Sequence, residues 1–229
     1  VPRLAIAYKT TERSQVSIAY GIFYQVPQNN YLKFNNHLRS EKASHYIMNF
    51  QYQHENRTLR IEAYYKDYRK LVKYDYQNSP EPDSYNNDGY GMAGGIDIFW
   101  RDRKTFKNSD YWISYSFIDT KRNYENYSEP ATPTFVSSHN LSAVYKYWIS
   151  KLSTQLSITY KFASGRPYYN PNHDNFLNDR TKAYQNLSIN CSYLTQLFGK
   201  FTIVHFSVNN LPGFKNVFGY KYSSEPGTD

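Results

Sequence analysis

The chain has 229 residues, of which 19% are aromatic, and its 26 tyrosines far outnumber its 3 tryptophans. Its length suffices for one large domain. Its mean hydropathy of −0.79 and the lack of any apolar run near ~20 residues exclude membrane-spanning helices. Its single cysteine, Cys191, excludes an intrachain disulfide framework. The formal net charge is +8, but the lysines and arginines are spread over turns, loops and strand faces, so we expect no nucleic-acid partner.

Alternation of apolar and polar residues with a period of two is the dominant pattern, and it predicts β-strands. In chain order, the predicted strands cover residues 3–10, 14–23, 43–54, 59–65, 92–100, 110–120, 141–149, 152–162, 183–193 and 199–209. No segment has a 3.6-residue period, and β-branched and aromatic residues dominate, so we expect no helix. Strands of roughly 9–12 residues match the ~9–11 that cross a bilayer at a tilt.

The connections between the predicted strands alternate between short and long. The short ones are residues 11–13, 55–56, 102–109, 150–151 and 194–198, and the long ones are 24–42, 76–89, 121–137 and 165–182. Tight turns on one side of a membrane and large loops on the other produce this order in an up-and-down barrel, whereas a Greek-key sandwich does not require it. We therefore predict an all-β, antiparallel, up-and-down transmembrane β-barrel, with about ten strands in this chain.

Aromatic and charged residues support the same interpretation. Aromatic residues near predicted strand ends are expected to form girdles at the membrane surfaces: Tyr64, Tyr65, Tyr68, Trp100, Tyr111, Trp112, Tyr145, Tyr147 and Trp148. Charged residues on the polar strand faces would be costly in a dry core, so we expect a wet or plugged lumen for Arg60, Glu62, Lys66, Asp97, Arg101, Lys146 and Lys161. The alternative is a soluble, Tyr-rich β-protein that binds polysaccharide.

Four groups of segments resemble TonB-dependent outer-membrane receptors, especially the type common in Bacteroidetes. They are residues 1–3 with 20–27, 40–46 with 59–66, 163–171 (ASGRPYYNP), and 208–211 with 216–220. The resemblance implies a 22-stranded barrel with a plugged lumen. Residues 1–229 would be the C-terminal part of that barrel, and we expect that the plug domain and the closing strand are not present in this chain. The start at Val1 agrees with a trimmed protein or an internal piece.

The resemblance implies uptake across a bacterial outer membrane, with lipid around the barrel and the TonB complex acting through the absent plug region. The imported nutrient would be scarce and bulky, such as a metal chelate, cobalamin or a glycan. Aromatic and polar side chains of the long loops are the expected ligand contacts, with loop packing as the alternative role for each: Tyr168, Tyr169, Asn170, His173, Tyr85, Tyr124 and Tyr127.

We expect no enzyme activity, no cofactor and no metal site. His205, Ser207 and Asn209 would share one strand face, but neighbours on such a face lie about 7 Å apart, too far for a nucleophile–base hydrogen bond. The loop around His173 and Asp174 has too few acidic residues for calcium. The remaining alternative is a non-transporting outer-membrane barrel, such as an adhesin, an assembly factor or an enzyme.

Overall fold

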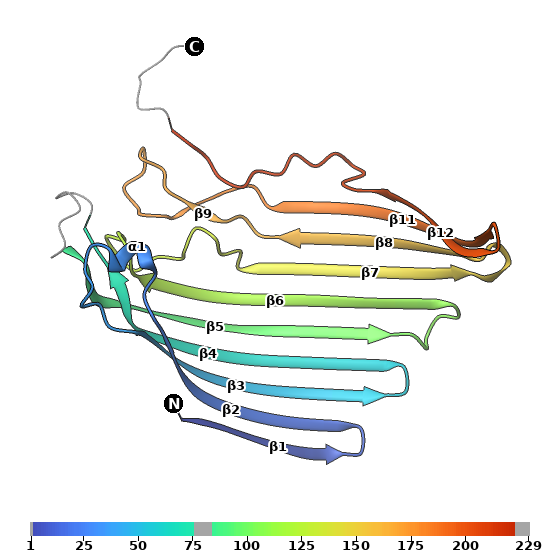
Figure 1. Cartoon of the computed structure of the whole chain (residues 1–229), viewed down its shortest axis with the longest axis horizontal. Coiled ribbons are helices and arrows are strands. Elements are labelled where there is room, and N and C mark those ends of the chain that lie inside the picture. Colours follow the sequence, from blue (N-terminus) through green and yellow to red (C-terminus); the bar gives the residue numbers. More distant parts are fainter. Residues whose placement is uncertain (1, 76–83, 223–229) are drawn as a thin grey trace, which may run out of the picture.

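The computed structural model describes residues 2–75 and 84–222, and nearly all its elements are antiparallel strands (Figure 1). Ten strands form one sheet in the order β1-β2-β3-β4-β5-β6-β7-β8-β11-β12, and β9 and β10 form a separate hairpin. Their bounds are β1 Arg3–Thr11, β2 Ser14–Gln25, β3 Glu41–His54, β4 Arg57–Lys73, β5 Asn86–Asp102, β6 Ser109–Asn123, β7 His139–Ile149, β8 Thr154–Ala163, β9 Pro167–Tyr168, β10 Asp179–Arg180, β11 Tyr184–Leu197 and β12 Lys200–Val208. The predicted all-β, antiparallel fold is confirmed.

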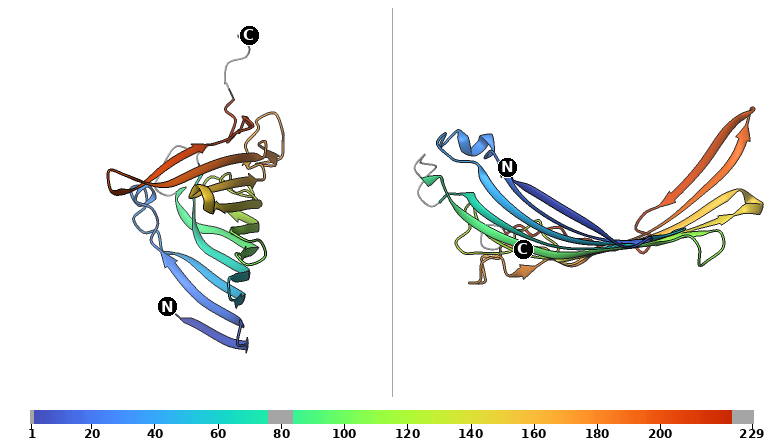
Figure 2. Two further views of the ribbon diagram at one scale, coloured as in Figure 1. Left: turned by 90° about the vertical axis from the view of Figure 1, so that its right-hand side faces the viewer. Right: turned by 90° about the horizontal axis from the view of Figure 1, so that it is seen from below.

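The two ends of the sheet differ, as predicted. The long connections gather at one end and the short turns at the other (Figure 1). In a transmembrane barrel the short turns face the periplasm and the long loops face the outside. The sheet is bent into a curved wall (Figure 2). Within the described residues, no helix is long and apolar enough to span a membrane.

Several predicted boundaries were wrong. One long loop contains a helical turn, α1 (Asn29–Leu32), which is too short to show a 3.6-residue period. Strands β4 and β5 run further toward the long loops than predicted. The extension of β5 is mostly polar, and bulges around Leu71 interrupt the alternation in the extension of β4. Residues 150–152 form a 3-10 turn, so Leu152 precedes strand β8 rather than lying in it. Of the predicted loop 76–89, residues 76–83 lie outside the described residues.

The two faces of the sheet have opposite chemistry. The pairing register joins Ile6 to Ile18, Ile18 to Met48, and onward through Ala63 to Ile96, so one apolar band crosses the first five strands. Ile6, Ile18, Met48 and Ile96 are all exposed. No second layer covers this outward face within the described residues, which contradicts a soluble protein whose apolar faces pack together. An exposed apolar surface of this extent requires lipid or a partner.

Of the predicted girdle residues, those on the outward face by register are Tyr65, Trp100, Tyr111, Tyr145 and Tyr147. Tyr65 lies on the outward face beside Tyr46, whose ring centroid is 6.3 Å away. Towards the short turns, Tyr111 and Tyr145 lie 6.5 Å apart on the same face. The predicted girdle residues on the opposite face are Tyr64, Tyr68, Trp112 and Trp148. Successive strand residues alternate between faces, so adjacent pairs such as Tyr64 and Tyr65 cannot both face lipid.

The inner face carries the charged residues. Arg101 donates to Asp110 through Nε at 2.9 Å and through a terminal nitrogen at 2.5 Å. Trp112 lies between two cations: the Arg101 guanidinium carbon is 5.5 Å and the Lys146 Nζ 5.1 Å from its ring centroid. Arg60, Glu62, Lys66 and Asp97 share this face by register. Such a face is compatible with a wet or filled lumen, where charge can be paired or hydrated.

Candidate functional site

Two adjoining hollows at the long-loop end form the candidate site. One measures about 330 Å³ and includes Arg166 and Lys182, and the other measures about 530 Å³ and includes Tyr168 and Tyr169. Both are lined by Phe218, which lies between them. We call this pair of hollows the loop furrow. It lies between the β8–β11 connection and the segment that follows β12.

Tyr168 anchors an aromatic wall in the furrow. Its ring centroid is 4.7 Å from that of Tyr220 and 6.5 Å from that of Tyr222. The segment containing Tyr220 and Tyr222 follows the last strand, so residues far apart in the sequence form one wall. A hydrogen bond with Tyr222, with smaller contributions from burial and from nearby Asp179, raises the pKa of Tyr168 to about 12. Tyr168 therefore keeps its proton at physiological pH, and the wall presents ring faces and hydroxyls to the hollow.

The tip of the same connection is fixed by three polar side chains. Asp179 Oδ2 accepts a hydrogen bond from Asn170 Nδ2 at 2.6 Å and lies 2.7 Å from His173 Nδ1. Asn170 Nδ2 is also 3.3 Å from His173 Nδ1. Tyr169 follows Tyr168 on this tip and remains 58% exposed. Of the seven predicted contacts, Tyr168 and Tyr169 line the furrow, while Asn170 and His173 brace the loop that carries them.

Tyr124 and Tyr127 belong to a small core beneath the loops. Tyr127 is 7% exposed and packs with Ala131 and Leu177. Its ring centroid lies 4.8 Å from Tyr124 and 5.2 Å from Phe176. Burial raises the pKa of both tyrosines. Tyr127 therefore joins the 121–137 loop to the 165–182 loop by packing. Loop packing is the role named above as the alternative to ligand contact.

Tyr85 also lies within a packed aromatic cluster. It is 6% exposed, stacks on Phe34 at 5.0 Å between ring centroids, and lies 4.9 Å from Tyr74. Asn35 Nδ2 donates to the Tyr85 carbonyl oxygen at 2.8 Å. These contacts tie α1 to the start of β5, so the structure places Tyr85 away from the furrow lining.

A third hollow, of about 260 Å³, lies on the inner side near Arg122, Glu41 and Glu125. The Arg122 guanidinium carbon is 4.5 Å from the Tyr68 ring centroid and 5.8 Å from that of Phe135. Its Nε is buried and has no hydrogen-bond partner among the described groups. An unpaired buried donor is costly, so an acceptor oxygen entering this hollow would be stabilised.

The furrow therefore combines ring faces with positive charge. The Arg166 guanidinium carbon lies 6.0 Å from the Phe218 ring centroid, and Lys182 is exposed beside it. Aromatic walls with few convergent polar groups are typical of ligand sites. Among residues 2–75 and 84–222, no three His, Cys, Asp or Glu side chains are grouped to hold a metal.

Sequence reasoning missed half of the furrow. It did not select Phe218, Tyr220 or Tyr222 as contacts, although aromatic residues spaced two apart were a visible signal. It also missed the pair Ser192 and His205, whose Oγ and Nδ1 lie 2.8 Å apart across β11 and β12. The prediction considered distances along one strand and left out contacts with the neighbouring strand. Asn209 lies beyond the end of β12, and Ser207 donates instead to Asn190.

A family model described as TonB dependent receptor-like, beta-barrel, matches residues 1–211. A comparison with curated protein sequences gives no match.

Several solved structures of transporters and receptors have a similar fold. The FrpB iron transporter from Neisseria meningitidis has a TM-score of 0.71 at 14% identity, over 92% of this chain and 34% of that chain. The ferric yersiniabactin uptake receptor FyuA from Yersinia pestis has a TM-score of 0.69 at 14% identity, over 97% and 34%. The outer membrane transporter YddB from Escherichia coli has a TM-score of 0.74 at 12% identity, over 95% and 37%. At these identities the likeness is one of fold, and this chain spans about a third of each relative.

Proposed function

We propose, because this chain belongs to the family of TonB-dependent receptor-like β-barrels, that the whole protein is an uptake receptor for a scarce, bulky nutrient. As predicted, the chain is part of a barrel wall in a bacterial outer membrane. The observation that supports uptake is the loop furrow, which opens among the long loops above the polar inner face. A likeness to the Bacteroidetes type in particular stays a prediction.

The side chains of the furrow are suited to bind a ligand with planar apolar parts and some negative charge. Tyr168, Tyr220 and Phe218 offer ring faces, and Arg166 and Lys182 offer positive charge. Metal chelates often have this chemistry, and the similar FrpB and FyuA are by their descriptions an iron transporter and a ferric yersiniabactin receptor. We therefore rank a metal chelate before cobalamin or a glycan. We also infer that the TonB complex drives uptake by the whole protein, through a plug region.

The proposed activity can be tested in cells that lack or carry the full-length gene. Uptake of ⁵⁵Fe-labelled ferric chelates, ⁵⁷Co-cobalamin and labelled oligosaccharides would be compared between the two strains, with and without a functional TonB system. We expect one class to accumulate only when both the receptor and TonB are present. Gene-dependent accumulation that persists without TonB would contradict the inference that the TonB complex supplies the energy for uptake. If no class accumulates in a gene-dependent way, the uptake assignment fails.

The pair Tyr168 and Tyr169 should contribute directly to ligand binding. In the full-length receptor, the double change Tyr168→Ala and Tyr169→Ala removes two ring contacts, each worth about 0.5–1.5 kcal/mol beyond area burial. We expect roughly tenfold weaker binding of the transported ligand, measured with the labelled compound on whole cells. The matched control is Tyr24→Ala with Tyr90→Ala, which removes two exposed tyrosines outside the furrow. Unchanged affinity in the first variant would assign Tyr168 and Tyr169 to loop packing.

The relatives' descriptions name transport rather than catalysis, and we extend that role to this protein. The Ser192–His205 contact lies on the inner face of the sheet edge. His205 Nε2 has no carboxylate or carbonyl partner among the described residues to orient the ring, which a nucleophile–base pair requires. We therefore propose no catalytic role for this pair.

A further inference from the structure

The short-turn end of the sheet carries exposed apolar side chains next to lysines. In the β5–β6, β7–β8 and β11–β12 turns, the apolar residues Phe106, Leu152 and Phe198 are at least half exposed, and Phe198 fully so. Each has a lysine within two residues along the chain. We call these residues the turn rim: Phe106, Lys107, Lys151, Leu152, Phe198 and Lys200.

The charge of this end is strongly positive. The five short turns and the first residue of β12 carry six cations, Arg13, Arg103, Lys104, Lys107, Lys151 and Lys200, and two acids, Glu12 and Glu55. Lys104 forms an ion pair with Glu55. Lys107, Lys151 and Lys200 are exposed and take part in no ion pair with any described residue. Their charge is therefore available to a partner.

The rim continues the lipid-facing side of the sheet. The Phe106 ring centroid lies 5.8 Å from that of Tyr111, which lies on the outward face of the sheet with Tyr145. In β12, Lys200 lies opposite Leu197, and both share the outward face with Tyr193 and Val204 by alternation. Aromatic and apolar tips that adjoin a girdle lie at the boundary between acyl chains and head groups. Lysine side chains beside them extend toward the head-group phosphates.

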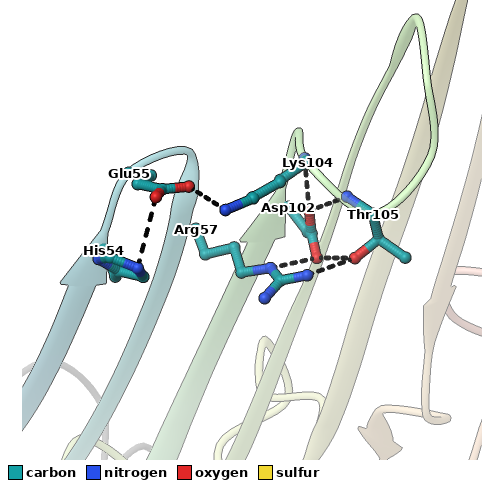
Figure 3. Close-up of polar contacts among 6 residues, drawn as sticks. All are labelled: His54, Glu55, Arg57, Asp102, Lys104 and Thr105. Atoms are coloured by element: carbon teal, nitrogen blue, oxygen red, sulfur yellow. Dashed lines mark hydrogen bonds and ion pairs between the residues drawn. The ribbon is translucent and has the colours of Figure 1, made fainter.

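The β5–β6 turn is held in a fixed shape (Figure 3). Asp102 accepts hydrogen bonds from the backbone nitrogens of Lys104 at 2.7 Å and Thr105 at 2.9 Å. Arg57 Nε donates to the same carboxylate at 3.0 Å. Lys104 reaches across to Glu55 in the β3–β4 turn (Figure 3). A turn already fixed in this way loses little conformational entropy when a partner binds.

We propose that the turn rim binds anionic phospholipids of the periplasm-facing leaflet, with acyl chains against Phe106, Leu152 and Phe198 and phosphates on Lys107, Lys151 and Lys200. Phe106 adjoins Tyr111 on the outward face, and Lys200 lies on the same face, which favours a lipid over a soluble acidic protein. Each lysine near an anionic surface contributes binding energy that salt screens. The proposal depends on the outer-membrane location and is independent of which nutrient the receptor takes up.

The test uses the purified full-length receptor in a non-ionic detergent. Phosphatidylglycerol or phosphatidylcholine is titrated in, and bound lipids are counted by native mass spectrometry. We expect wild type to prefer phosphatidylglycerol roughly tenfold or more, and the preference to fall as salt rises to about 0.5 M. The variant Lys107→Gln, Lys151→Gln, Lys200→Gln should lose most of it.

The control removes the same charge from the opposite end. Lys33, Lys215 and Lys221 are exposed at the long-loop end, and the variant with all three changed to Gln should keep the preference. The variant Lys107→Arg, Lys151→Arg, Lys200→Arg should also keep the preference, which separates charge from folding defects. The proposal fails if wild type does not prefer phosphatidylglycerol, if the rim variant retains the preference, or if both Gln variants lose it equally.

Discussion

Tyr168 shows how one side chain can be tuned by a distant segment. Its hydroxyl is hydrogen-bonded to Tyr222, and Asp179 lies close enough to disfavour a negative charge on the ring. A hydrogen bond that depends on the phenol proton, and a nearby anion, both hold the proton on the oxygen. The pKa of Tyr168 therefore reports whether the segment after β12 is docked on the furrow.

This docking predicts a titration behaviour. The folded pKa of Tyr168, about 12, lies above the unfolded value of about 10. The folded state then holds the proton more tightly, so the stabilisation is fully present below pH ~10 and is lost as pH rises through ~12. The difference in absorbance at about 295 nm between wild type and Tyr168→Phe should titrate near 12. Changing Tyr222 to Phe should move it back toward 10. A difference spectrum that titrates near 10 in wild type would show that the two hydroxyls are not paired.

Strand β5 shows why two adjacent glycines need not be equivalent. A Cβ on Gly95 would lie 2.4 Å from the Phe117 carbonyl oxygen and 2.5 Å from the Tyr64 hydroxyl. A Cβ on Gly94 would meet nothing closer than 3.7 Å. Tyr64 lies over Gly95 on the inner face, and that close approach is possible only because the glycine has no side chain.

The strand therefore offers a matched pair of substitutions. Gly95→Ala should destabilise the barrel by about 1–3 kcal/mol, because the backbone oxygen of Phe117 cannot move away as a side chain can. Gly94→Ala faces the outward side and should change stability by much less. The midpoint of the heat-induced mobility shift, measured for both variants of the full-length protein, checks this. Equal midpoints would mean that Tyr64 and the β5–β6 pairing adjust without cost.

At the scale of the whole molecule, the ten-stranded sheet presents one free edge at β1 and another at β12 within the described residues. Backbone groups without partners cannot remain in a bilayer, where each costs several kcal/mol. The matched relatives are about three times as long as this chain. We infer that further strands pair with both edges in the whole protein.

Closure of the barrel in the full-length protein predicts how that protein fractionates and migrates on a gel. The full-length protein should fractionate with the outer membrane and migrate differently on a gel before and after boiling, because a closed barrel has no edge from which unfolding can begin. A protein that is extracted without detergent, or that migrates identically in both states, would contradict a closed barrel in lipid. The outward apolar face would then need another partner.

The sequence by itself determined the ten strands, their antiparallel order and the two different ends, because a period of two and the alternation of connection lengths are local signals. It did not determine that Tyr127 is buried while Tyr169 is exposed. Only the tertiary structure decided this, and only it joined Tyr168 to Tyr220 and Tyr222. The physical reason is that the burial of a loop residue depends on packing between segments more than 40 residues apart, to which no local pattern is sensitive.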